Sequence, residues 1–490
     1  MNQPNIIVVL VDQMRRDALS CAGDPNVRTP NLDRLASRGV RFTSACSTFP
    51  ACVPFRFSMV TGEYAHSRNV PALGYRLSPA EHTLGDALKS QGYATAYIGK
   101  WHLYSAYGVS GGLTLSQASR TPIPASHRRG FDYWRGFELR NDFYDTAYFV
   151  DDDPVPRRLP GHQTDGLFDL AAHYLEADRP EDQPFFLLLS VEAPHPPFMA
   201  SEQSLKRVRD RGPMVPRPNV DLAAISFFPP EWHEESGPAG KVDPDDPASV
   251  ARVAEANMQA YYAMIEMIDD NMGKLDTVLE QTGLADNTVV VFLSDHGELG
   301  GSHGLLGKAE PWEESVGVPL IVAGPDRYVA GHGATASVPV NTEDLFPTFV
   351  GLTGGSASAR FTGMNLAPFI RGECAEPVRD GVLLEFVTET RSNRSYYDET
   401  WRGIRSDHLK YTVIGDRAGA RPWQLFDLST DPYEMNNLVD QSAGADLAAD
   451  MHGRLIGLLD RSGDDYALAP AFGHPARNAV VPDAEVARSI

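Results

Sequence analysis

The stretch "NIIVVLVD", residues 5–12, contains six consecutive apolar residues, and five of them are β-branched. A short continuous apolar run of this kind is typical of a strand that is buried on both faces inside a parallel sheet. The run ends at Asp12, so a carboxylate follows the strand directly. The stretch therefore predicts a central parallel strand with an acidic group at its carboxyl end.

The same pattern recurs along the chain, and each apolar run is followed by a polar motif. The runs at 94–98, 185–191 and 288–293 are followed by GKWH, EAPHPPF and SDHG, respectively. Helical periodicity at 84–91 and 258–281 separates them. Strands that alternate with helices predict an α/β fold: a large mixed, mostly parallel sheet flanked by helices.

The pattern changes after about residue 372. GVLLEFV, WRGIRSDHLKYTVI and WQLFDLSTDPYEMNNL read as strands of a small antiparallel sheet, with a turn at Asp431-Pro432. A helix is predicted over 445–459, followed by an extended tail. We therefore expect two domains, residues 1–372 and a smaller C-terminal unit at 373–490, and we expect the proline-rich segment 213–247 to be an excursion from the main sheet.

Composition narrows the classes of function. The chain has 43 Lys and Arg against 65 Asp and Glu, a net charge of −22, which disfavours a nucleic-acid partner. The basic run 206–211 is interpreted as a solvated helix face. Four cysteines do not make a disulfide framework. We see neither an apolar run long enough to span a membrane nor a signal peptide after MNQP, so we expect a cytoplasmic protein without membrane association.

Polar residues gather where the predicted strands end. Ligands of open α/β sheets bind beyond the carboxyl ends of the strands, and the residues expected at that edge are Asp12, Lys100, His102, His195, Asp295 and His296. Two carboxylates at one edge repel each other unless a cation lies between them. With the Gln13 amide and the His296 imidazole they predict a metal site. Lys100, Arg56 and Lys308, the last in a glycine-rich loop, predict an adjacent oxyanion site.

Several motifs occur together in one order: CVPFR at 52–56 with Thr61-Gly62, then GKWH, SDHG, Lys308 and the C-terminal WQLFDLSTDPYEMNNL. In this set the chain resembles the type I, formylglycine-dependent sulfatases of the alkaline phosphatase superfamily. The resemblance implies that a formylglycine-generating enzyme oxidises Cys52 to formylglycine. It also implies one divalent cation, held by Asp12, Gln13, Asp295, His296 and residue 52.

The resemblance further implies a mechanism for hydrolysis of a small sulfate monoester. The hydrated formylglycine attacks sulfur, and Arg56, Lys100 and Lys308 stabilise the developing charge. His195, with Lys308, protonates the departing alcohol, and His102 takes the proton whose loss expels sulfate.

The chain departs from the commonest sulfatase pattern at Gln13, Phe55, Glu63 and His296. The Gln and His variants resemble branches that contain choline-sulfatase-like enzymes and phosphonate monoester hydrolases. Ca²⁺ is the metal that the family implies, with Mn²⁺ as an alternative because an imidazole replaces an oxygen ligand. Two alternatives to a sulfatase stay open: a phosphonate monoester or phosphodiester hydrolase, and an unmatured scaffold that only binds. The alcohol half of the substrate and a homo-oligomeric state are not readable from the sequence.

Overall fold

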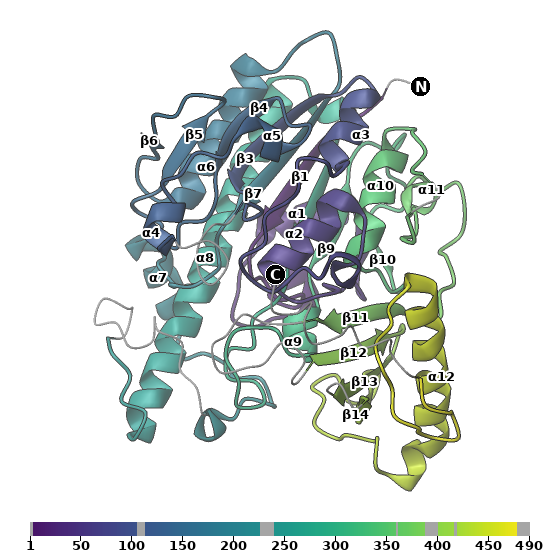
Figure 1. Cartoon of the computed structure of the whole chain (residues 1–490). Coiled ribbons are helices and arrows are strands. Elements are labelled where there is room, and N and C mark those ends of the chain that lie inside the picture. The colour runs from purple at the N-terminus through teal and green to yellow at the C-terminus, as the bar shows by residue number, and fades with distance from the viewer. Residues whose placement is uncertain are drawn as a thin grey trace.

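The protein contains two β-sheets, a large one with helices on both faces and a small one near the C-terminus (Figure 1). The structure is a computed structural model, and it describes residues 3–104, 113–225, 240–358, 361–387, 400–415 and 419–477. The large sheet has the strand order β10-β2-β9-β8-β1-β7-β3-β4-β5-β6. In that order its strands are β10 (Ala334–Ala336), β2 (Gly39–Phe42), β9 (Leu320–Ala323), β8 (Thr288–Ser294), β1 (Asn5–Val11), β7 (Phe185–Val191), β3 (Ala94–Lys100), β4 (Tyr133–Phe137), β5 (Ala147–Val150) and β6 (Arg157–Arg158).

The centre of the large sheet is parallel. β1 lies between β7 and β8 and is parallel to both, and β3 is parallel to β7 and β4. Antiparallel pairs, such as β8 with β9 and β4 with β5, extend the sheet on either side. The prediction of a mixed, mostly parallel sheet is confirmed, and β3 and β8 run slightly beyond their predicted ends, to Lys100 and Ser294.

Both faces of the sheet are buried, as the continuous apolar runs predict. Ile6, Val8 and Leu10 of β1 join one apolar core, and the alternate residues of the same strand join a second. The first core is covered by α2 (Cys52–Thr61), α3 (Leu84–Ser90) and α10 (Leu345–Leu352); the second by α1 (Pro30–Ser37), α6 (Gln163–His173) and α8 (Pro247–Gln281). The other α-helices that the structure describes before the small sheet are α4 (Leu115–Ala118), α5 (Ala125–Arg128), α7 (Glu202–Arg209), α9 (Glu313–Val316) and α11 (Ala367–Ile370).

Helix α8 starts earlier than the periodicity predicts. It begins at Pro247 rather than near residue 258, because the Asp246 side chain accepts a hydrogen bond from the Ala248 N–H and Pro247 occupies the first turn. The segment that precedes it contains one short 3₁₀ turn, Leu222–Ala224, and residues 226–239 lie outside the described residues. Within the described ranges, no helix combines the length and apolarity needed to cross a bilayer.

The small sheet is antiparallel throughout, as predicted. Its strands are β11 (Val382–Phe386), β12 (Thr400–Arg405), β13 (Leu409–Gly415) and β14 (Arg421–Asp427). Helix α12 (Ala445–Ser462) covers one face, where Leu383, Ile404 and Tyr411 join its apolar residues. On the other side, Leu384, Phe386 and Trp401 join the core beneath α2. The proposed division at residues 372/373 stays a prediction, and the end of the predicted tail, 478–490, lies outside the described residues.

Candidate active site

The pairing register brings polar residues of three strands to the same level. Val11 is paired with Val191 on one side and with Ser294 on the other, so the next residues are Asp12, Glu192 and Asp295. β3 ends at Lys100 on the far side of β7. The preceding Gly99 has φ +108°, and a Cβ there would lie 1.9 Å from the Ser190 carbonyl oxygen, so glycine is required where the two strands end. The polar residues therefore meet at the carboxyl edge, as the sequence predicts.

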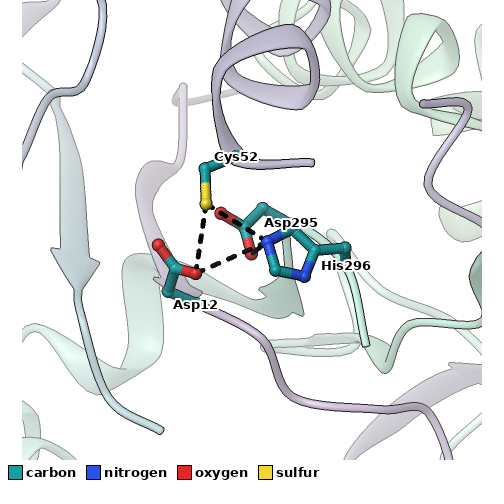
Figure 2. Close-up of side chains that lie close together, drawn as sticks. All are labelled: Asp12, Cys52, Asp295 and His296. Atoms are coloured by element: carbon teal, nitrogen blue, oxygen red, sulfur yellow. Dashed lines mark hydrogen bonds and ion pairs between the residues drawn. The ribbon is translucent and has the colours of Figure 1, made fainter. Parts of the chain in front are cut away.

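Four buried side chains converge at this edge (Figure 2): Asp12, Cys52, Asp295 and His296. Each offers one metal-ligating atom, and these atoms all lie within 4.8 Å of one another. Cys52 is the first residue of α2, which directs its thiol toward the strand ends. The Cys52 Sγ lies 3.2 Å from His296 Nε2 and 3.5 Å from Asp12 Oδ1.

The donor set fits a divalent cation. His296 Nδ1 donates to the Gly297 carbonyl at 3.0 Å, so the neutral ring presents the Nε2 lone pair to the cluster. Burial and the Lys308 charge hold the pKa of His296 well below its usual value, so the ring is neutral. Its Nε2 lies 3.5 Å from Asp295 Oδ1 and 3.6 Å from Asp12 Oδ1. Lone pairs that face one another repel, and a cation between them turns the repulsion into attraction.

The two carboxylates influence each other strongly. Burial and the nearby Asp12 charge raise the pKa of Asp295 to about 7. The pKa of Asp12 is lowered: burial would raise it, but Lys100 at 2.7 Å and the other surrounding cations outweigh that effect. A cation bound between the two would favour the ionised form of both.

Gln13 lies directly beside this cluster. Its backbone has φ +72°, an unusual conformation for a residue with a side chain, and its N–H donates to Asp295 Oδ1 at 3.0 Å. The Gln13 Oε1 accepts a hydrogen bond from Lys308 Nζ at 2.8 Å. The same ammonium lies 3.2 Å from Cys52 Sγ. Lys308 thus bridges the Gln13 amide and the Cys52 side chain.

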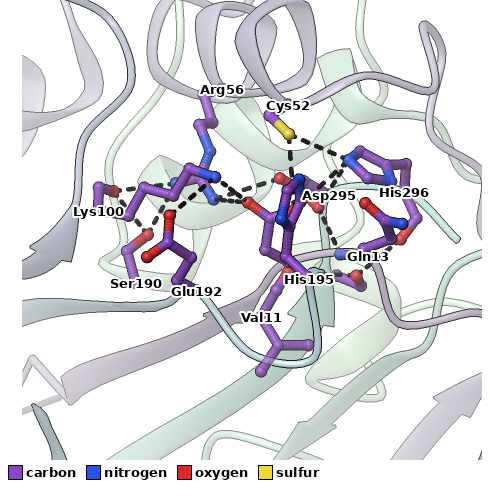
Figure 3. A network of polar contacts seen from close by, with 12 residues as sticks. Val11, Gln13, Cys52, Arg56, Lys100, Ser190, Glu192, His195, Asp295 and His296 are labelled. Atoms are coloured by element: carbon purple, nitrogen blue, oxygen red, sulfur yellow. Dashed lines mark hydrogen bonds and ion pairs between the residues drawn. The ribbon is translucent and has the colours of Figure 1, made fainter. Parts of the chain in front are cut away.

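Two further cations lie behind the carboxylates (Figure 3). Arg56 Nη2 lies 3.2 Å from Asp12 Oδ2 and 3.2 Å from Asp295 Oδ2, so one guanidinium contacts both acids. Lys100 is fully buried; burial would lower its pKa, but the Asp12 carboxylate outweighs burial and raises it. Both groups therefore carry their charges inside the protein.

The two predicted acid–base histidines are also at this edge. His195 donates through Nδ1 to the Pro196 carbonyl at 2.5 Å, and burial and Lys308 hold its pKa well below the usual value. His102 has φ +57° and donates its backbone N–H to the Glu138 carbonyl at 2.9 Å. Burial and the Lys100 charge likewise lower the pKa of His102. The structure thus gathers every site residue that the sequence predicts; their individual roles stay predictions.

Cys52 is not prepared to act as a thiolate. Burial, reinforced by Asp12, raises the pKa of its thiol to about 11. Cysteine nucleophiles work as thiolates and have a lowered pKa. The environment of residue 52 is therefore unlike that of a direct cysteine nucleophile.

Sequence reasoning missed three polar residues of the site: Ser190, Glu192 and Glu298. Ser190 Oγ accepts from Arg56 Nη1 at 2.7 Å and donates to the Lys100 carbonyl, while Glu192 Oε1 lies 3.5 Å from Lys100 Nζ. Their place at the end of β7, next to the EAPH motif, could have indicated them. Glu298 accepts a hydrogen bond from Gln13 Nε2, and its only sequence signal is its closeness to the SDHG motif.

Comparison with known proteins gives consistent results. Residues 4–356 match the family described as Sulfatase, and residues 301–461 match the one described as "N-sulphoglucosamine sulphohydrolase, C-terminal". An ulvan-active sulfatase of Formosa agariphila is 30% identical over 95% of this chain and 82% of its own length. PehA of Trinickia caryophylli, a multifunctional alkaline phosphatase superfamily protein, is 28% identical over 92% of this chain and 94% of its own. A solved structure from Bacteroides thetaiotaomicron, reported with its metabolism of multiple glycosaminoglycans, has a TM-score of 0.77 at 26% identity and covers 94% of this chain and 97% of its own.

Proposed function

Because the chain belongs to the sulfatase family of the alkaline phosphatase superfamily and is a sulfuric ester hydrolase, we propose that it hydrolyses a small sulfate monoester with a formylglycine made from Cys52 and one bound divalent cation. One observation supports this most: the acceptor atoms of Asp12, Asp295 and His296 converge on the Cys52 side chain. A binding scaffold has no need for a buried cysteine within such a ligand set.

The cation would be held by Asp12, Gln13, Asp295, His296 and residue 52. Ca²⁺ is the family default, and Mn²⁺ is the alternative because one ligand is a nitrogen. The cation would supply positive charge to the sulfate oxygens, and the formylglycine would supply an oxygen nucleophile with a second hydroxyl for release of sulfate.

The remaining roles belong to the chain's own cations. Lys308 lies 3.2 Å from Cys52 Sγ, so we assign its ammonium to the oxygens of the sulfate that reacts there. We assign Lys100, which pairs with Asp12 at 2.7 Å, to contribute further positive charge. Arg56 contacts both acids, and we assign it to hold the two carboxylates in place as well as to stabilise charge.

Proton transfer is assigned to the two histidines and Lys308. Lys308 Nζ and His195 would protonate the oxygen of the departing alcohol, and His102 would accept the proton that residue 52 gives up. The lowered pKa of His195 is consistent with an acid only once the negative sulfate is bound, since a nearby anion raises the pKa of an imidazole.

The names of the relatives suggest a saccharide as the alcohol, so sulfated sugars come first in a substrate panel. The alternative activity, hydrolysis of phosphonate monoesters or phosphodiesters, would use the same site and is favoured by the similarity to a multifunctional superfamily member. Steady-state kinetics on sulfated sugars, aryl sulfates, choline sulfate, a phenylphosphonate monoester and a phosphodiester separates the two. A higher kcat/KM for the phosphorus esters would make the alternative the main activity.

Peptide mass spectrometry tests the maturation. Protein produced together with a formylglycine-generating enzyme should yield a Cys52 peptide that is lighter than the thiol form by about 18 Da. Activity should rise with the fraction of the lighter peptide, and Cys52→Ala should be folded and inactive. A fully active preparation in which Cys52 is entirely an unmodified thiol would overturn the mechanism. A fully matured preparation without turnover on any ester would favour a binding scaffold instead.

A further inference from the structure

We infer that Glu298 is a positioning residue: it sets which end of the Gln13 carboxamide faces the cation site. This inference rests on the proposed function, because it concerns a ligand of the proposed cation. Glu298 is buried in the loop that follows β8, and it has no assigned role in the reaction proposed above.

The two oxygens of Glu298 have separate partners. Oε1 accepts hydrogen bonds from the backbone N–H groups of Gly300 and Gly307, each at 2.8 Å. Oε2 accepts from Gln13 Nε2. One oxygen therefore holds the two ends of the glycine-rich loop that leads to Lys308, and the other holds the side chain of Gln13.

The orientation of the Gln13 amide is determined from both ends. An ammonium has only donors, so the Gln13 atom that faces Lys308 Nζ at 2.8 Å is the oxygen Oε1. The nitrogen Nε2 then faces an acceptor, the Glu298 carboxylate. The two amide orientations are almost identical in shape, and only these hydrogen-bond partners distinguish them.

The rest of Gln13 is already held in place. Its N–H donates to Asp295 Oδ1, and its carbonyl accepts from the Tyr261 hydroxyl at 3.1 Å. The remaining freedom is rotation of the side-chain amide. A reversed amide would present N–H donors to the cation and to Lys308, and both contacts would be repulsive.

The Glu298 hydrogen bond should also strengthen Gln13 as a ligand. A neutral amide is a weaker ligand than the carboxylate common at this position, and donation from Nε2 to a carboxylate increases the negative charge on Oε1. Loss of such an outer partner typically weakens metal binding by about 10–100-fold.

Glu298→Gln tests this orientation sharply. The oxygen of the new amide can still accept from Gly300 and Gly307, so the loop contacts persist. Its nitrogen, however, would meet Gln13 Nε2, and two donors would face each other. Ca²⁺ titrated calorimetrically into matured, metal-stripped protein should bind about 10–100-fold more weakly than to the parent. Glu314→Gln is the matched control: it neutralises another buried glutamate, which contacts Asn219 and Arg217 instead, and should change the affinity by less than about twofold.

Gln13→Glu completes a double-mutant cycle and does not alter the loop. Alone it places two carboxylates side by side, so despite its extra charge it should not tighten Ca²⁺ binding. Combined with Glu298→Gln it restores a donor opposite an acceptor, and there it should tighten binding. Three outcomes would each overturn the inference: parent-like Ca²⁺ affinity of Glu298→Gln, an additive double-mutant cycle, or tighter Ca²⁺ binding by Gln13→Glu alone. The measurement on Gln13→Glu alone tests the inference even if Glu298→Gln does not fold. A matured parent that binds neither Ca²⁺ nor Mn²⁺ would refute the proposed cation site itself, and the inference with it.

Discussion

His66 should stabilise the protein in a strongly pH-dependent way. It follows α2, yet its Nδ1 lies 2.6 Å from Glu385 Oε2 in β11 and its Nε2 lies 3.2 Å from the Ser462 carbonyl at the end of α12. Both ring nitrogens face acceptors, which favours the doubly protonated imidazolium. Burial would lower the pKa of His66, but Glu385 outweighs burial and raises it to about 9. Relative to an unfolded value of about 6.5, this corresponds to about 3 kcal/mol.

The contribution has a defined pH window. It is fully present below about pH 6.5, where the histidine is protonated in both states, and it is lost as the pH rises through about 9, where the folded protein also loses the proton. The change to test is His66→Gln, which removes the titration. The free energy of unfolding, measured with urea and tryptophan fluorescence, should differ from the parent by about 3 kcal/mol more at about pH 6 than at about pH 10.

A surface histidine supplies the control for this measurement. His408 is half exposed and paired at the surface with Asp407 at 2.7 Å, so His408→Gln should change the free energy of unfolding by less than about 1 kcal/mol. If the difference between parent and His66→Gln is the same at every pH, the His66 imidazolium does not stabilise the contact between the segment after α2 and the C-terminal sheet.

Three further predictions concern the site. Lys308→Ala should lower kcat/KM by about 10²-fold, about 3 kcal/mol of transition-state stabilisation, whereas Lys206→Ala, on the exposed face of α7, should leave the kinetics unchanged; equal losses would misplace the oxyanion site. Asp12→Ala should abolish Ca²⁺ binding measured by calorimetry and abolish turnover, and full activity of a parent sample verified as metal-free would contradict the metal assignment. His296→Asn should shift the preference from Mn²⁺ toward Ca²⁺ when stripped enzyme is reconstituted with each metal, and an unchanged preference would count against His296 as a ligand.

The central strands of the large sheet could be predicted because each has a recognisable local sequence pattern. β1 and β7 are buried on both faces, so each is a continuous apolar run with a clear end. The two outermost strands on one side of the sheet, β10 and β2, could not be predicted in the same way. β2 has four residues and β10 has three, which is too few for a periodic pattern, and they form only because β9 and β2 offer them partners from distant parts of the chain.

The residues of the site also differ in how far the sequence predicts their place. Asp12, Lys100 and Asp295 could be placed together because the carboxyl ends of neighbouring parallel strands share one edge. Cys52 and Lys308 lie on a helix and a loop, where no rule of sheet geometry applies. Motif resemblance indicated Cys52, and the glycine-rich loop together with the resemblance indicated Lys308. The contact of Glu298 could not be predicted from its closeness to the SDHG motif, since no local pattern marks a glutamate that receives a hydrogen bond from an amide 285 residues away in the sequence.

The small C-terminal sheet helps to position the two elements that carry Lys308 and Cys52, namely the glycine-rich loop and the start of α2. Trp401 of β12 donates its Nε1–H to the Ala309 carbonyl at 3.1 Å, directly after Lys308, and Lys410 of β13 donates to the Pro311 carbonyl. The N–H of Ala309 in turn donates to the Pro50 carbonyl at 3.2 Å, just before α2. The strands of the large sheet position the carboxylates directly, whereas the start of α2 and the glycine-rich loop are not strands of that sheet. Hydrogen bonds from the small antiparallel sheet help to fix the loop, so the C-terminal sequence helps to keep the ammonium of Lys308 within reach of residue 52.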